Sequence, residues 1–122
     1  MNNSKEKLFA KKTRYLRDQL PVRLGNLASN LARIDSISKH PTLGDSASKV
    51  IFESKLFIEW TAVDASLSQQ VELLELQRIL ARWGLAWNEI WDDPERRNHI
   101  GYEARQWSNR VLALSGLFDT NN

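Results

Sequence analysis

The chain has 122 residues, a length typical of one domain, and it contains no cysteine, which excludes disulfides and thiolate metal sites. Hydrophobic residues make up 42% and charged residues 26%, the ordinary balance of a globular protein, and no apolar run approaches the roughly 20 residues that span a bilayer. The net charge of +2 is unevenly distributed, because residues 1–40 carry nine lysines and arginines against three acidic residues, whereas residues 41–122 carry eight against twelve. This asymmetry fits a basic arm for nucleic acid, but it fits better two surfaces that attract each other within the chain or across a dimer.

The sequence predicts a single all-α domain over residues 1–122. Every long segment has helical periodicity, and only five glycines and three prolines interrupt it. The first residues, MNNSKEKLFAKK, lack the apolar stretch of a secretory signal. We therefore expect a cytoplasmic protein that does not enter a membrane.

The first helical pattern extends from about residue 5 to 38 and contains Pro21. Its apolar positions keep one phase on both sides of this proline: Phe9, Thr13, Leu16, Leu20, Leu24, Leu27, Leu31 and Ile34. Proline inside a helix costs about 3 kcal/mol and usually bends the helix. The preserved phase predicts one long helix kinked at Pro21, and the alternative is two helices that meet there. A loop is expected at His40-Pro41.

The next helix is expected from about residue 46 to 65, capped by Asp45 or Ser46, and it is apolar on two sides. One face is formed by Ala47, Val50, Ile51, Phe57, Ile58 and Ala62. A second face, roughly opposite, is formed by Phe52, Leu56, Trp60 and Val63. Because a helix with two apolar faces must bury both, we predict that the second face contacts another subunit.

Residues 66–69, SLSQ, have the form of a capping box and predict a helix that continues to about Trp91. Its apolar positions follow a heptad pattern: Leu73, Leu76, Leu80, Trp83, Trp87 and Ile90. The opposite face is expected to be polar, with Glu75, Arg78, Arg82 and Glu89. Trp83 and Trp87 are therefore predicted to lie in the core, and Trp91 to be half-exposed beside it.

The sequence DDPE predicts the start of the last helix, with Asp93 as N-cap and Pro94 in the first turn. Its apolar stripe comprises Ile100, Ala104, Trp107, Val111 and Leu114. Gly116 followed by Leu117 fits a left-handed C-cap. Amphipathic helices joined by short loops predict an antiparallel four-helix bundle.

The strongest polar constellation flanks the apolar stripe of the last helix and comprises Arg96, His99, Glu103 and Arg110. With Trp91 before it, the candidate polar surface site is Trp91, Arg96, His99 and Glu103. A carboxylate one turn from a histidine can orient the ring as a general base. The alternative, which we favour, is an ion-pair ladder on the flank of a helix. Since the chain has two histidines and no Glu-x-x-His pair, we expect neither a metal nor a cofactor.

Arg33 and His40 lie at the ends of the segment RIDSISKH. Their spacing resembles the Arg-x(4–6)-His pattern of the HEPN family of helical ribonucleases, whose size and helical content are similar. The resemblance covers these eight residues, and it implies RNA cleavage by Arg33 and His40. His40, however, precedes Pro41 in an expected loop, whereas such a motif is expected at a helix start.

Lys7, Lys11 and Arg14 share one flank of the first helix, where they would neutralise phosphates. The alternative is a solvated helix end, because the basic residues are spread around the helix and Glu6 and Asp18 interrupt them. Taken together, the sequence predicts a non-enzymatic interaction protein that self-associates, most simply as a homodimer. Nucleic-acid binding is the second hypothesis and HEPN-like ribonuclease activity the third.

Overall fold

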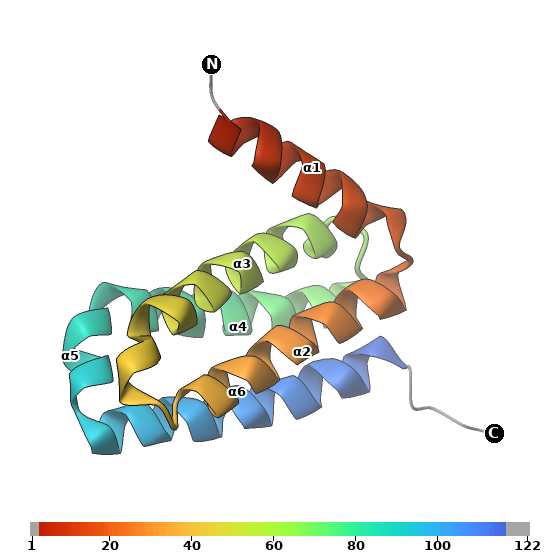
Figure 1. Cartoon of the computed structure of the whole chain (residues 1–122). Coiled ribbons are helices and arrows are strands. Elements are labelled where there is room, and N and C mark those ends of the chain that lie inside the picture. The colour runs from red at the N-terminus through yellow and green to blue at the C-terminus, as the bar shows by residue number, and fades with distance from the viewer. Residues whose placement is uncertain (1–2, 117–122) are drawn as a thin grey trace.

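The computed structural model of the protein describes residues 3–116. Within that range it is all-helical, as predicted, with six α-helices, a short 3-10 helix and no strand. The elements are α1 (Asn3–Arg17), α2 (Leu20–Ile37), η1 (Pro41–Leu43), α3 (Gly44–Ala62), α4 (Leu67–Leu85), α5 (Trp87–Asp92) and α6 (Pro94–Ser115) (Figure 1). Helix α2 lies against both α3 and α6, and α3 also lies against α4. The short α5 closes one end of the molecule, while α1 extends across α3 with its beginning outside the body (Figure 1).

The first predicted helix is divided in two, so the kinked single helix is wrong and its alternative is confirmed. Helix α1 ends at Arg17 and α2 begins at Leu20, with extended Gln19 as N-cap. Pro21 therefore occupies the first turn of α2, where its missing N–H costs no helical hydrogen bond. Buried Arg23 holds the break closed, because its side chain donates to the Asp18 carbonyl oxygen at 3.0 Å and to the Asp64 carboxylate at 3.0 Å.

A single buried side chain, Tyr15, anchors α1 to the body. Its ring stacks on Phe57 with a centroid separation of 4.1 Å, and its hydroxyl lies 2.5 Å from Thr61 Oγ1. Burial raises the pKa of Tyr15 to about 12. The predicted stripe of α1 does not face the core, since Phe9 is 73% exposed and Leu16 is exposed as well. The stripe of α2 is buried as predicted, from Leu24 to Ile34.

Glu53 of α3 forms a second link between α1 and the body. Its carboxylate pairs with Lys11 of α1 and accepts a hydrogen bond at 3.0 Å from Asn30 of α2. Burial of the Glu53 carboxyl alone would raise its pKa, but the hydrogen bonds from Lys11 and Asn30 outweigh burial and hold the pKa below its ordinary value. Glu53 is therefore a charged tie among three helices.

Helix α3 begins at Gly44 directly after η1, without a side-chain cap, so the predicted caps Asp45 and Ser46 are wrong. The second apolar face predicted on this helix is not one continuous exposed surface. Trp60 is buried in the core beside Tyr15, and Leu56 packs partly buried against the core. Phe52 and Val63 are exposed. The reason is that α1 covers the middle of this face. The periodicity of α3 could not indicate the position of α1.

The helix predicted from the capping box begins as expected but ends early. Ser66 accepts a hydrogen bond from the Gln69 N–H, and the Gln69 side chain accepts one from the Ser66 N–H, which confirms the capping box. The helix stops at Leu85 instead of Trp91, and Ala86, with φ −123° and ψ 33°, joins it to α5. Gly84, a weak helix former, lies just before this break.

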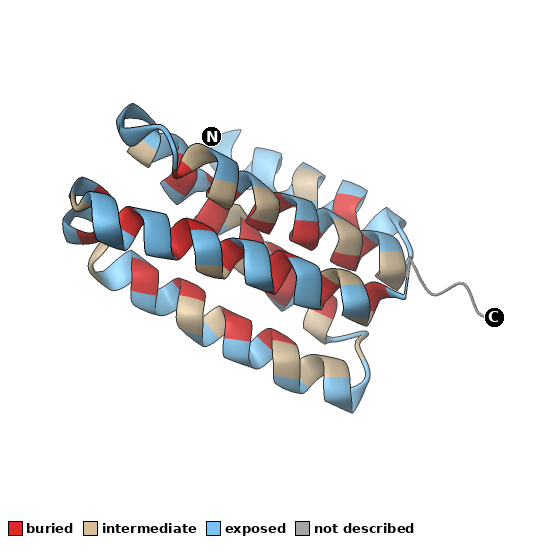
Figure 2. Cartoon of the chain, turned by 90° about the horizontal axis from the view of Figure 1, so that it is seen from below, coloured by how far each residue is buried: buried red, intermediate tan, exposed pale blue. Residues whose placement is uncertain are grey.

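Helix α6 has the ends that the sequence predicts. Asp93 caps its N-terminus by accepting from the Glu95 and Arg96 N–H groups, and Gly116 adopts a left-handed φ of 72° at its C-terminus. The predicted contact of Leu117 lies outside the described residues. Along its length α6 packs closely on α2, because Gly101 faces Ser38 and because Ser108 donates to the Ala28 carbonyl oxygen at 2.8 Å. Figure 2 shows the buried residues on the inward faces of the helices.

Candidate functional site: a pocket, a helical corner and an exposed apolar stripe

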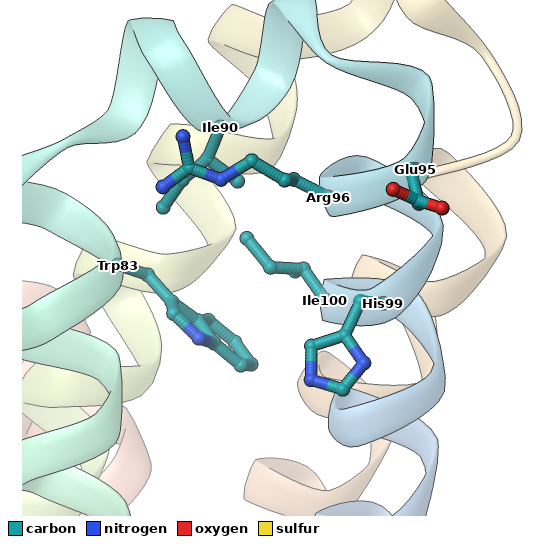
Figure 3. Close-up of a pocket in the computed structure, with 6 residues that line it drawn as sticks. All are labelled: Trp83, Ile90, Glu95, Arg96, His99 and Ile100. Atoms are coloured by element: carbon teal, nitrogen blue, oxygen red, sulfur yellow. The ribbon is translucent and has the colours of Figure 1, made fainter.

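A pocket of about 370 Å³ lies between the end of α4, α5 and the first turns of α6 (Figure 3). Its lining residues are Trp83, Ile90, Glu95, Arg96, His99 and Ile100. Trp83, Ile90 and Ile100 are buried and form its apolar part. Arg96 extends over the pocket toward Ile90, whereas the Glu95 carboxylate points away from it (Figure 3). This volume is near the lower end of the roughly 300–1,000 Å³ of small-molecule sites.

The predicted polar constellation is only partly assembled at this pocket. Arg96 and His99 line it, and His99 Nε2 lies 3.4 Å from the Glu103 carboxylate, the ion pair expected at that spacing. Both His99 and Glu103 are too exposed for this pair to be a strong interaction. Within residues 3–116 no three histidine or acidic side chains gather as a metal site.

Trp91, predicted to be half-exposed beside this site, is instead 5% exposed and faces the other way. Its indole N–H donates to the Pro41 carbonyl oxygen at 2.7 Å, and the neighbouring Trp87 donates to the Gly44 carbonyl oxygen at 3.3 Å. Trp87, predicted to be core, is only partly buried. The two predictions are wrong for one reason: the break at Ala86 turns α5 toward residues 41–44, whose carbonyl groups accept from both indoles.

Arg97 completes this arrangement, which we call the helical corner (Trp87, Trp91, Arg97 and residues 38–44). The buried guanidinium donates to the Ser38 carbonyl oxygen at 3.2 Å and to the Trp91 carbonyl oxygen at 2.6 Å, and it lies 5.8 Å from the centre of the Trp91 ring. Both carbonyls lie at helix C-termini, where a cation is favoured by the helix dipole. Arg97 carries no signal of this role in the sequence, because an arginine next to a helix cap is ordinarily exposed. The helical corner has a structural role.

The outer side of α4 carries an apolar stripe that the sequence analysis missed. Its exposed members are Leu67, Val71, Leu74, Ala81 and Leu85. The leucine and valine side chains among them are between 59% and 90% exposed. With Arg78 included, these positions are spaced 4, 3, 4, 3 and 4 and fall within an arc of roughly 80° on a helix. This spacing is present in the sequence. The outer face of α4 was predicted to be polar because a buried heptad lies on the other side of the helix and charged residues lie between the two apolar sides.

Charges are segregated along the flank of this α4 stripe. Glu72 and Glu75 lie in the first half of the helix, and Arg78 and Arg82 lie in the second half. Arg78 donates to Glu75 at 3.2 Å, and Glu72 pairs with Arg110 of α6, whose guanidinium also covers the Trp107 ring at 3.9 Å. On the other flank, a groove of about 370 Å³ separates α4 from α3 and is bordered by Leu74. The stripe therefore has an acidic half, a basic half and an adjoining hollow.

The predicted nucleic-acid contacts are not a set of equivalent free cations. Lys11 is engaged with Glu53, whereas Lys7 and Arg14 are exposed and make no hydrogen bond or ion pair within the described part of the chain. Nothing in the first eight residues of α1 is buried. Of the three candidates, Lys7 and Arg14 remain available to a partner.

Arg33 and His40 do not share a groove. Arg33 lines a shallow groove with Ser46, Lys49, Val50 and Glu53, a set that does not include His40. His40 is exposed and precedes η1. The geometry adds nothing to the resemblance to helical ribonucleases.

Comparison of the chain with protein-family models, with curated proteins and with solved structures finds no match. Among the described helices, none has the length and apolar character needed to cross a bilayer. Inferences about function therefore rest on the pocket, the α4 stripe and α1.

Proposed function

We propose that this chain is a cytoplasmic, non-enzymatic interaction protein that self-associates as a homodimer through the α4 stripe. The long helices α2, α3, α4 and α6 would form an antiparallel four-helix bundle that presents this stripe. The exposed apolar side chains of α4 carry the proposal. Burying one large apolar side chain contributes about 1.5–3 kcal/mol, and contiguous exposed patches of this kind are typical of interaction surfaces.

The charges beside the stripe favour a second copy as the occupant. If two α4 helices pack antiparallel through their stripes, about a two-fold axis at the level of residues 76 and 77, the acidic half of one faces the basic half of the other. Glu75 of each copy would then lie opposite Arg78 of the other, whereas parallel packing would bring like charges together. The groove beside Leu74 offers room for an apolar side chain of the second copy. A two-fold interface of this kind is self-complementary.

Replacing Leu74 by glutamate is expected to convert the dimer to a monomer, because a charge would be buried at the centre of the interface. Sedimentation equilibrium distinguishes a dimer, twice 14.1 kDa, from a monomer of 14.1 kDa. Phe52→Glu is the matched control, since Phe52 is equally exposed but lies on α3. It is expected to remain dimeric. A wild-type monomer at tens of micromolar would contradict self-association, and a monomeric Phe52→Glu would place the interface on α3.

The antiparallel geometry has its own test. Glu75→Arg and Arg78→Glu are each expected to weaken the dimer, since each places like charges opposite one another in both halves. The double substitution Glu75→Arg/Arg78→Glu is expected to restore it. Failure of the double variant to recover affinity would show that these residues do not face each other across copies.

Helix α1 supports nucleic-acid binding as a second candidate function. It carries six lysines and arginines against Glu6, a balance of +5, and its beginning lies outside the body. Such a helix can approach phosphates without disturbing the core. The basic residues that face solvent, and not Lys11, would make the contacts.

Reversing the charges of Lys7 and Arg14 is expected to abolish retention on heparin and on duplex DNA at low salt. Wild-type retention should fall steeply with salt, as counterion release requires. Lys49→Glu/Lys55→Glu on α3 is the control with the same change in net charge. Equal losses in both double variants would indicate a general charge effect and no specific site on α1.

A further inference from the structure

We propose that the pocket between α4, α5 and α6 binds a small amphipathic anion, with a carboxylate held by Arg96 and a hydrocarbon or aromatic body against Trp83, Ile90 and Ile100. The inference is independent of self-association. The space lies at the break at Ala86, where α5 leaves the axis of α4. The ring of Trp83 and the two isoleucines then face an opening that no described side chain fills.

Two hydrogen-bond donors at the pocket lack a partner within residues 3–116. The Arg96 side chain makes no hydrogen bond or ion pair, although Glu95 is its neighbour in the chain and acidic residues are common in this region. The indole N–H of Trp83 also makes no hydrogen bond within these residues, and it remains open to solvent, since the enclosed side-chain polar atom without a partner in this range is Gln77 Oε1. By contrast, the indoles of Trp87 and Trp91 both donate to backbone oxygens. A ligand that supplies acceptors would pair with both open donors at the pocket.

The electrostatics favour an anion over a neutral molecule or a cation. Arg96 spans the pocket, and the Glu95 carboxylate, which would repel an anion, points away from it (Figure 3). The lining residues of α6 belong to its first two turns, where the helix dipole also favours negative charge. The N–H groups of Glu95 and Arg96 are already engaged by Asp93. Recognition of the carboxylate therefore falls to the Arg96 side chain.

The probe is 4-phenylbutyrate, with 4-phenylbutan-1-ol as a neutral molecule of the same body. Binding is followed by the ¹H–¹⁵N resonance of the Trp83 indole, which is assigned by its absence in Trp83→Phe. We expect this resonance to shift with a Kd of about 0.1–1 mM, the range that a ligand of this size reaches in a partly open pocket. The alcohol is expected to bind about tenfold more weakly, because it cannot form a charge-assisted hydrogen bond.

Arg96→Met is expected to weaken phenylbutyrate binding about tenfold, toward the affinity of the alcohol. Arg33→Met, which removes an exposed arginine from a different groove, should leave binding unchanged. Glu95→Gln should bind as tightly as the wild type or tighter. The proposal is overturned if the Trp83 indole does not respond, if alcohol and acid bind equally, or if Arg33→Met and Arg96→Met weaken binding to the same extent.

Discussion

Replacing Arg97 by methionine is expected to lower the free energy of unfolding by about 2–5 kcal/mol. The substitution preserves apolar bulk but removes the donors to the carbonyl oxygens of Ser38 and Trp91, which are both in a buried environment. Leaving a buried acceptor without its partner costs about 1–3 kcal/mol for each group. The guanidinium also covers the Trp91 ring, so packing at the helical corner is lost as well. Equilibrium denaturation with urea measures the effect.

The adjacent residue provides a matched control for this prediction. Arg96→Met removes the same charge one position earlier in α6, where the side chain is exposed and makes no hydrogen bond among the described residues, and it should change the free energy of unfolding by less than about 0.5 kcal/mol. Arg97→Lys should lower the free energy of unfolding by an amount between those of Arg96→Met and Arg97→Met, because an ammonium group cannot reach both carbonyls with the geometry of a guanidinium. Equal effects of Arg96→Met and Arg97→Met would contradict a structural role for the helical corner.

Adding a single methyl group at Gly101 is expected to destabilise the protein by about 1–3 kcal/mol, the usual cost of overpacking. A Cβ at this position would lie 2.2 Å from Ser38 Oγ and 3.0 Å from Ser38 Cβ, at the close contact between α2 and α6. Rotation of the Ser38 hydroxyl relieves the first clash but not the second. The helices must therefore separate, although alanine is intrinsically the better helix former.

Gly84→Ala is the matched control for Gly101→Ala, because a Cβ at Gly84 has no atom within 4 Å. It should stabilise α4 by about 0.5–1 kcal/mol, the difference in helix propensity. Combining Gly101→Ala with Ser38→Gly should recover much of the loss, since the methyl group then occupies the space vacated by Ser38. Thermal and urea unfolding of the wild type, Gly101→Ala, Ser38→Gly and the double variant test this cycle. Additive effects in the double variant would show that the two residues do not compete for the same space.

The ends of the helices were predictable where a local signal determines them. Ser66 with Gln69, and Asp93, each satisfy backbone groups within a few residues, and the backbone angles that Pro94 and Gly116 adopt are equally local properties. Pro21 contains a local signal as well, but a weaker one. Proline has the same fixed φ and the same missing N–H inside a kinked helix and in the first turn of a new one. The two cases differ in whether the apolar residues before Pro21 are buried, and this burial is a property of the folded chain.

The tryptophans of the candidate site could not be placed from the sequence, because their partners are distant. Trp91 donates to Pro41 and Trp87 to Gly44, both more than 40 residues earlier in the chain. Periodicity describes which residues share a face, and it contains no information on a helix that turns at Ala86 to reach a loop. Trp83, which precedes the turn, is buried as predicted.

The same distinction applies to the apolar faces. The sequence predicts two apolar sides on the helix 46–65, but it could not indicate that α1 covers part of the second side. Tyr15 reaches across to Trp60 and Phe57, which closes the middle of the outer face of α3. Helix α4 has no such cover over Leu74. The predicted interface thus shifts by one helix, while the reasoning that an uncovered apolar face needs a partner still applies.

Helix α1 is attached to the body by few buried contacts, so its local stability is lower than that of the core. Tyr15 and the Lys11–Glu53 pair hold its second half, and the residues before them have no buried contact. Elements with few buried contacts open at a lower free energy than the core, in cooperative units. We therefore expect α1 to open at a lower free energy than α2 to α6, once the contacts of Tyr15, Lys11 and Arg23 are lost. Such opening would uncover Phe57 and Trp60 as new apolar surface.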